Sequence, residues 1–131
     1  MATKLNKVLI VEDDLSQKQL WNFVISRVSE HAQVDWAVSS EQALTMIKKN
    51  KSQGQSYDLL IVDLFLAGSE TGLDLLRSKE VVSVGPKTIL VSAIDQKNFE
   101  DQLSQELAHI KLIVKPLNII KCENTIVELV S

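Results

Sequence analysis

The apolar positions of this chain fall into short continuous runs separated by amphipathic stretches. Continuous runs of branched apolar residues are typical of strands that are buried on both faces of a parallel sheet. One further stretch, residues 34–38, mixes polar and apolar residues, as an edge strand does. The runs predict strands over residues 8–11, 59–62, 88–91 and 111–114, and the mixed stretch predicts an edge strand over 34–38.

The stretches between the strands carry apolar residues at helical spacing. Ser16 is the predicted N-cap of the first helix, because Gln19 follows it at the spacing of a capping box. Ser40 is predicted to cap the second helix. The predicted core-facing positions of the five helices are Leu20, Phe23, Val24 and Val28; Ala43, Leu44 and Ile47; Leu73 and Leu76; Phe99, Leu103 and Leu107; and Ile119, Cys122, Ile126, Leu129 and Val130.

Five strands and five helices in alternation predict right-handed βαβ crossovers and an α/β fold. Five strands fit a doubly wound, flavodoxin-like parallel sheet of the (βα)5 type, with strand order 2-1-3-4-5. No linker or internal repeat divides the sequence, so we expect a single domain over residues 1–131.

Composition narrows the possible functions. The net charge of −3 argues against direct nucleic-acid binding, which requires a basic face. No apolar run is long enough to cross a membrane. The one cysteine, Cys122, cannot form an internal disulfide, and no signal-peptide pattern follows Met1. We therefore expect a cytoplasmic protein.

The candidate chemistry lies at the strand ends. In the predicted strand order, the first and third strands are neighbours at the point where ligands bind in such sheets. The first strand ends in Glu12-Asp13-Asp14, the third in Asp63, the fourth in Ser92 and the fifth in Lys115. The acidic cluster and Asp63 should therefore face one cleft.

Grouped carboxylates repel one another, and a hard cation such as Mg²⁺ relieves that repulsion. Lys115 would neutralise further charge, and the Ser92 hydroxyl would donate a hydrogen bond to an added oxygen. A carboxylate nucleophile, a metal ion, a lysine and a hydroxyl together favour phosphoryl transfer. Asp14 is predicted to be solvated or to help start the first helix, and Asp58 to be a turn residue.

These motifs resemble the receiver domain of response regulators over nearly the whole chain. Residues 8–14 resemble its first strand and acidic pair, 58–64 its phosphoacceptor strand, 90–93 its switch hydroxyl and 114–116 its lysine and cis-proline turn. The resemblance implies that Asp63 accepts the phosphoryl group, with Ser92 and Lys115 contacting it. It also implies that Mg²⁺ is held by Glu12, Asp13, Asp63 and the backbone carbonyl of Phe65.

The resemblance also implies partners. A sensor histidine kinase or a histidine phosphotransfer protein would donate the phosphoryl group. The domain would signal by protein contact, through the face of the fourth helix, fifth strand and fifth helix, as a monomer or a phosphorylation-dependent dimer. It would be no enzyme in the ordinary sense, although it would assist its own phosphorylation and dephosphorylation.

The sequence departs from the family pattern at several positions. Ala67 stands where proline is usual, and Gly72 is one residue further from Asp63 than the family's glycine.

Leu112 replaces the usual Tyr or Phe three residues before the lysine. We hypothesise that output does not use the aromatic switch; an activated structure in which only Ser92 shifts locally and Leu112 swings from exposed to buried would contradict this. Phe65 and Ile94, beside the expected phosphoryl group, predict a long-lived phosphoryl group, because bulky apolar side chains hinder water.

Several alternatives stay open. The chain could be a receiver cut from a longer regulator or hybrid kinase, or a pseudo-receiver that binds partners without phosphate. An aspartate-nucleophile phosphatase would carry a second carboxylate at the position of Phe65. A flavin or nucleotide binder would carry a Gly-rich or hydroxyl-rich loop after the first strand, where Glu12-Asp13-Asp14 stands instead.

Overall fold

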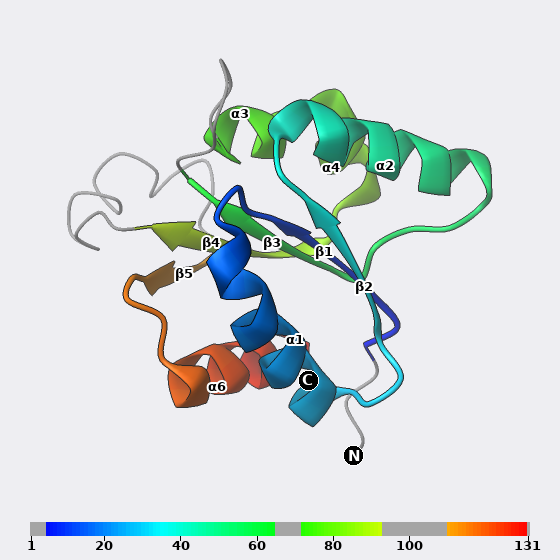
Figure 1. Cartoon of the computed structure of the whole chain (residues 1–131). Coiled ribbons are helices and arrows are strands. Elements are labelled where there is room, and N and C mark those ends of the chain that lie inside the picture. The colour runs from blue at the N-terminus through cyan, green and yellow to red at the C-terminus, as the bar shows by residue number, and fades with distance from the viewer. Residues whose placement is uncertain (1–4, 65–71, 93–109, 131) are drawn as a thin grey trace.

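The computed structural model describes residues 5–64, 72–92 and 110–130. In this part of the chain, five parallel strands form one sheet in the order β2-β1-β3-β4-β5 (Figure 1). The predicted strands and their order are therefore confirmed, and β2 is an edge strand as expected. The strands are β1 (Lys7–Val11), β2 (Gln33–Ala37), β3 (Leu59–Asp63), β4 (Lys87–Ser92) and β5 (Lys111–Val114).

Helices cover both faces of the sheet, which makes the fold a three-layer α/β sandwich. One face is covered by α1 (Lys18–Val28) and α6 (Ile119–Val130). The other is covered by α2 (Ser40–Ser52), α3 (Gly72–Leu76) and α4 (Lys79–Val84) (Figure 1). The predicted helix with Phe99, Leu103 and Leu107 lies outside the described residues. None of the described helices is long and apolar enough to span a bilayer.

The strand side chains divide between two apolar cores, one on each face. Along β1, Leu9 and Val11 point into the core under α2, while Val8 and Ile10 point into the core under α1. All four side chains are fully buried. This is the reason that the sequence of β1 shows no polar alternation: both of its faces are covered.

The first two helices begin at residues other than those predicted. A 3-10 turn, η1 (Leu15–Gln17), precedes α1, and its cap is Asp14, whose carboxylate accepts a hydrogen bond from the Ser16 backbone N–H. Ser16 is thus inside the turn and not the N-cap. For α2 the cap is Ser39, which accepts from the backbone N–H of Gln42 at 3.1 Å. A side-chain oxygen thus caps α2 and the turn η1, whereas Gln17, the N-cap of α1 itself, makes no side-chain capping bond. Both predicted capping residues, Ser16 and Ser40, were wrong.

The described part of the segment between β3 and β4 holds two helices where one was predicted. Residues 77 and 78 separate α3 from α4, and the Ser78 hydroxyl accepts from the backbone N–H of Val81 to start α4. The left-handed backbone of Gly85 (φ 63°) ends α4. Leu76, predicted to face the core, is buried there.

Candidate functional site

The candidate site lies where the carboxyl ends of β1, β3, β4 and β5 meet. Val11 pairs in register with Val62, so the residues that follow them, Glu12 and Asp63, come next to each other. On the other side of β3, Ser92 pairs with Val114, the residue before Lys115. The strand order thus brings the predicted residues from four strands to one edge of the sheet, which is where open α/β folds bind ligands.

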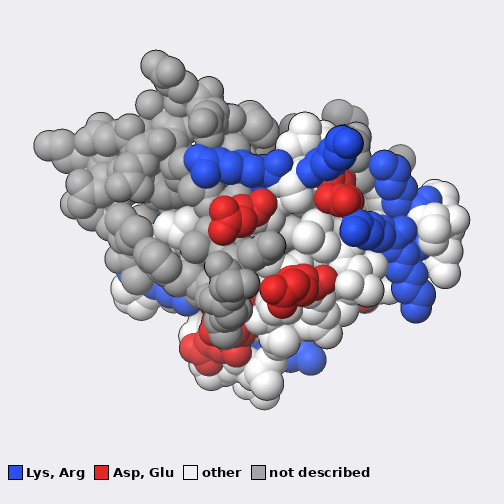
Figure 2. Space-filling model, turned by 90° about the horizontal axis from the view of Figure 1, so that it is seen from above, with Lys and Arg blue, Asp and Glu red and all other residues white. Residues whose placement is uncertain are grey.

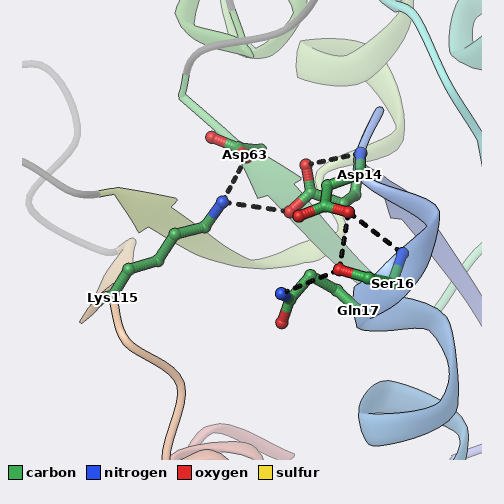
Figure 3. A network of polar contacts seen from close by, with 6 residues as sticks. Asp14, Ser16, Gln17, Asp63 and Lys115 are labelled. Carbon is green, nitrogen blue, oxygen red and sulfur yellow. Dashed lines mark hydrogen bonds and ion pairs between the residues drawn. The ribbon is translucent and has the colours of Figure 1, made fainter.

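Lys115 joins the two buried carboxylates of this site. Its Nζ lies 2.8 Å from Oδ2 of Asp63 and 3.2 Å from Oε1 of Glu12. The carboxylate side chains are 7% and 4% exposed, while the lysine is 27% exposed. Figure 3 shows the lysine extending from the end of β5 toward Asp63 across the ends of the neighbouring strands. One ammonium group therefore serves as the shared counter-charge of two carboxylates that water barely reaches.

The close grouping changes the proton affinity of Glu12. Burial, together with the hydrogen bond and negative charge of Asp63, raises the pKa of Glu12 to about 7, against the lowering effect of Lys115. For Lys115, burial lowers the pKa, but its bonds to Asp63 and Glu12 outweigh burial and raise it. The site therefore keeps its lysine charged and has a surplus of negative charge when Glu12 ionises.

Three carboxylates of the site converge closely enough to hold a cation. One oxygen each from Glu12, Asp13 and Asp63 can lie within 4.8 Å of one another. Glu12 and Asp63 are buried, and Asp13 is exposed to solvent. This all-oxygen donor set, open on the Asp13 side, fits Mg²⁺, which binds one or two carboxylates and keeps several waters.

Asp14, the remaining carboxylate of the acidic cluster after β1, has a different role. Its Oδ1 accepts hydrogen bonds from the Ser16 backbone N–H at 3.0 Å and from the Ser16 hydroxyl at 2.6 Å (Figure 3). These bonds lower the pKa of Asp14. Asp14 thus starts the turn before α1, one of the two roles expected for it.

The remaining predicted residues divide into those that the structure describes and those that it does not. Ser92 is fully buried at the end of β4, and its carbonyl accepts from the Lys115 backbone N–H at 2.8 Å. The peptide bond between Lys115 and Pro116 is cis, as the resemblance implied. Leu112 is half-buried against the core under α2. Phe65, Ala67 and Ile94 lie outside the described residues.

One contact of the site was missed from the sequence. The contact between Lys115 and Glu12 was not predicted, because Glu12 was considered only as a metal ligand. The available signal was that both residues directly follow strands that end at the same edge of the sheet. The carboxylate of Asp58 accepts from the backbone N–H groups of Asn6 and Lys7 at 2.8 and 2.9 Å. It ties the start of β1 to the start of β3, in agreement with its prediction as a turn residue outside the site.

Residues 8–126 match the family described as the response regulator receiver domain. No curated protein sequence matches the chain.

Solved structures share the fold at low sequence identity. The signal receiver domain of a Luxo repressor protein from Vibrio parahaemolyticus is 21% identical, with a TM-score of 0.78 over 97% of this chain and 91% of that one. A CheY-like receiver domain protein from Methanospirillum hungatei is 24% identical, with a TM-score of 0.72 over 95% and 93%. A two-component response regulator from Cytophaga hutchinsonii is 16% identical, with a TM-score of 0.76 over 96% and 97%.

Proposed function

This chain belongs to the response regulator receiver domain family of two-component signalling, and we propose that it accepts a phosphoryl group on Asp63 in a Mg²⁺-dependent reaction. The donor would be a phosphohistidine on a sensor kinase or a phosphotransfer protein. The observation that supports this most directly is the pairing of Asp63 with Lys115 beside two further carboxylates. A nucleophile needs positive charge around it to accept an anionic group, and these residues provide or recruit that charge.

In the proposed reaction, a carboxylate oxygen of Asp63 forms a bond to phosphorus while the bond from phosphorus to the histidine nitrogen breaks. The electron pair of that bond leaves with the imidazole. Glu12, Asp13 and Asp63, with the Phe65 carbonyl, would hold the Mg²⁺. When bound, the ion supplies positive charge that offsets the phosphoryl oxygens.

Lys115 and Ser92 would then act on the phosphoryl group. The ammonium of Lys115 already lies on an oxygen of Asp63 at 2.8 Å, so transfer to a phosphoryl oxygen on the same residue requires only a small movement. The Ser92 hydroxyl would donate a hydrogen bond to another phosphoryl oxygen. Ser92 is fully buried, and its carbonyl accepts a hydrogen bond from the Lys115 backbone N–H. A movement of Ser92 toward the phosphoryl group would therefore also move the end of β5.

Output would follow from a shift between two conformations that already exist in equilibrium. The face formed by the fourth predicted helix, β5 and α6 would contact the downstream protein, as a monomer or a phosphorylation-dependent dimer. Part of that face lies outside the described residues. In β5, the exposed Lys111 bonds Glu128 of α6 at 3.5 Å, and Leu112 lies beside it.

Phosphoramidate provides a test, because it carries the same phosphorus–nitrogen bond as phosphohistidine. Incubation of the protein with phosphoramidate and Mg²⁺ should give a new acyl phosphate signal in its ³¹P NMR spectrum, and hydroxylamine should remove that signal. The signal should be absent from Asp63→Asn. A wild-type protein that gives no signal, or a signal that persists in the variant, would contradict the proposal and favour a phosphate-independent binding module.

A further inference from the structure

A second hollow lies at the other ends of the strands, beside the edge strand β2. Its volume is about 400 Å³, within the range of small-molecule sites. It lies where α2 ends, and Lys7 and Gln33, the first residues of β1 and β2, line it together with Asp35, Lys49, Asn50 and Tyr57. The phosphoacceptor site is at the opposite ends of the same strands, so the two sites are separate.

Asp35 presents a negatively charged carboxylate to this hollow. Its carboxylate is half-buried in the middle of β2 and accepts hydrogen bonds from the Tyr57 hydroxyl at 2.6 Å and the Gln33 amide at 3.2 Å. Both donors are neutral, and within the described part of the chain no lysine, arginine or histidine forms an ion pair with it. A half-buried carboxylate without an ion-pair partner is unusual, because removing a charge from water is costly.

Two ammonium groups on the same hollow, those of Lys7 and Lys49, form no ion pair among the described residues either. Lys7 Nζ donates to the neutral oxygens of Asn50 and Gln55, and it lies 5.5 Å from the centre of the Tyr57 ring. Lys49, in the last turn of α2, is exposed and forms no ion pair among the described residues. Seen from above, Lys and Arg side chains gather on the right of the helical face that includes α2 (Figure 2).

The floor between these charges is fixed by buried polar residues. The Asn50 amide donates to the Tyr57 hydroxyl at 3.0 Å and to the Met46 carbonyl at 2.7 Å. Asn50 and Tyr57 are 7% and 5% exposed. Because these bonds hold the ring and the amide in place, a ligand would not have to order them on binding.

We propose that this hollow binds a free amino acid with an acidic side chain, with its ammonium on Asp35 and its two carboxylates on Lys7 and Lys49. Such a ligand carries one positive and two negative charges, which complement the one negative and two positive charges of the hollow. Glutamate is the probe of choice. Glutarate is its matched control, since it keeps both carboxylates and lacks the ammonium group.

The binding is testable by NMR titration of the full chain with each compound. Glutamate should shift the backbone amide signals of Gln33, Asp35, Lys49 and Gln53 along saturating curves, while the signal of Lys48, which does not line the hollow, should stay in place. Glutarate should bind at least about threefold more weakly, as expected for the loss of one partly exposed charge pair. Shifts that do not saturate, or equal affinity for the two compounds, would overturn the proposal.

Three variants test which residue of the hollow contacts each charged group of the ligand. Asp35→Asn should abolish the preference for glutamate over glutarate, and Lys49→Gln should weaken both compounds by about threefold. Lys48→Gln is the control on the same helix and should leave both affinities unchanged. Lys49 is exposed, so its variant tests the idea even if Asp35→Asn unfolds. Unchanged affinity in Lys49→Gln, or an equal loss in Lys48→Gln, would show that the hollow is not the binding site.

Discussion

The Nζ atom of Lys115 lies 2.8 Å from Oδ2 of Asp63, although Asp63 ends β3, Lys115 follows β5, and the two residues are 52 positions apart. The same nitrogen is 3.2 Å from Glu12. The lysine therefore offsets part of the repulsion within a buried acidic pair. The same pair, with Asp13, forms the set of oxygens into which a divalent cation would fit.

Removing the lysine charge should destabilise the fold in the absence of metal. For Lys115→Met at pH 8 in EDTA, we expect a loss of roughly 2 kcal/mol in the free energy of unfolding, because two ionised carboxylates lose their counter-charge. Urea denaturation measures this loss. Asp63→Asn in the same background should recover part of it, because it removes one of the two repelling charges. Strictly additive effects in that double-mutant cycle would contradict the proposed coupling.

The raised pKa of Glu12 predicts a pH dependence of stability without metal. Its pKa is 4.5 in the reference state and about 7 in the fold, so the folded state holds a proton that the unfolded state has released between these values. Stability should therefore fall by roughly 3 kcal/mol as pH rises from about 4.5 to 7, and then level off. Chemical denaturation in EDTA across this range should show the fall in wild type. Glu12→Gln should flatten it; an unchanged slope in that variant would rule out Glu12 as the source.

Mg²⁺ should stabilise the wild-type fold through Asp13. Because a ligand bound only to the folded state raises stability, the midpoint of thermal unfolding should increase with Mg²⁺, by roughly 4 °C for each kcal/mol of binding. Asp13 is exposed, so Asp13→Asn should leave the metal-free midpoint almost unchanged and remove most of the increase. Asp14→Asn is the matched control, because Asp14 caps the turn before α1 and should keep the increase. Equal responses in the two variants would exclude a specific site.

The lifetime of the phosphoryl group should be long because of Phe65 and Ile94. Two bulky apolar side chains are expected to hinder the attacking water. In the double variant Phe65→Asn and Ile94→Glu, decay should be faster by roughly tenfold, equivalent to about 1.4 kcal/mol in the barrier. The rate is measured after removal of the phosphoryl donor. Decay at the same rate in the variant and the wild type would disprove the role of these side chains.

Most of the fold could be predicted because both faces of the central strands are covered. Continuous branched runs at β1, β3 and β4 follow directly from that burial, and the strand order follows from their number and alternation with helices. The helix starts were less predictable. Ser39 and Ser40 are adjacent and either could cap α2, and Asp14 competes with Ser16 before α1. The break between α3 and α4 depends on the capping bond of Ser78, which no glycine or proline announces.

The candidate site was predictable as a set of residues, although not in its contacts. The strand ends identified Glu12, Asp13, Asp63, Ser92 and Lys115 as neighbours, because parallel strands end at one edge of the sheet. Which carboxylates the lysine would contact depends on side-chain conformation, which the sequence pattern does not encode. The same holds for the neutral partners of Lys7 and Asp35, whose charges look ordinary in the sequence.

The central claim is tested most directly by intact mass spectrometry after incubation with acetyl phosphate. Wild-type protein should gain a single phosphoryl group with Mg²⁺ and none when EDTA replaces the metal. Asp63→Asn should gain none under either condition, whereas Asp14→Asn should behave as wild type. No adduct in wild type with Mg²⁺, or an adduct that persists in Asp63→Asn, would contradict the assignment of Asp63 as the phosphoacceptor.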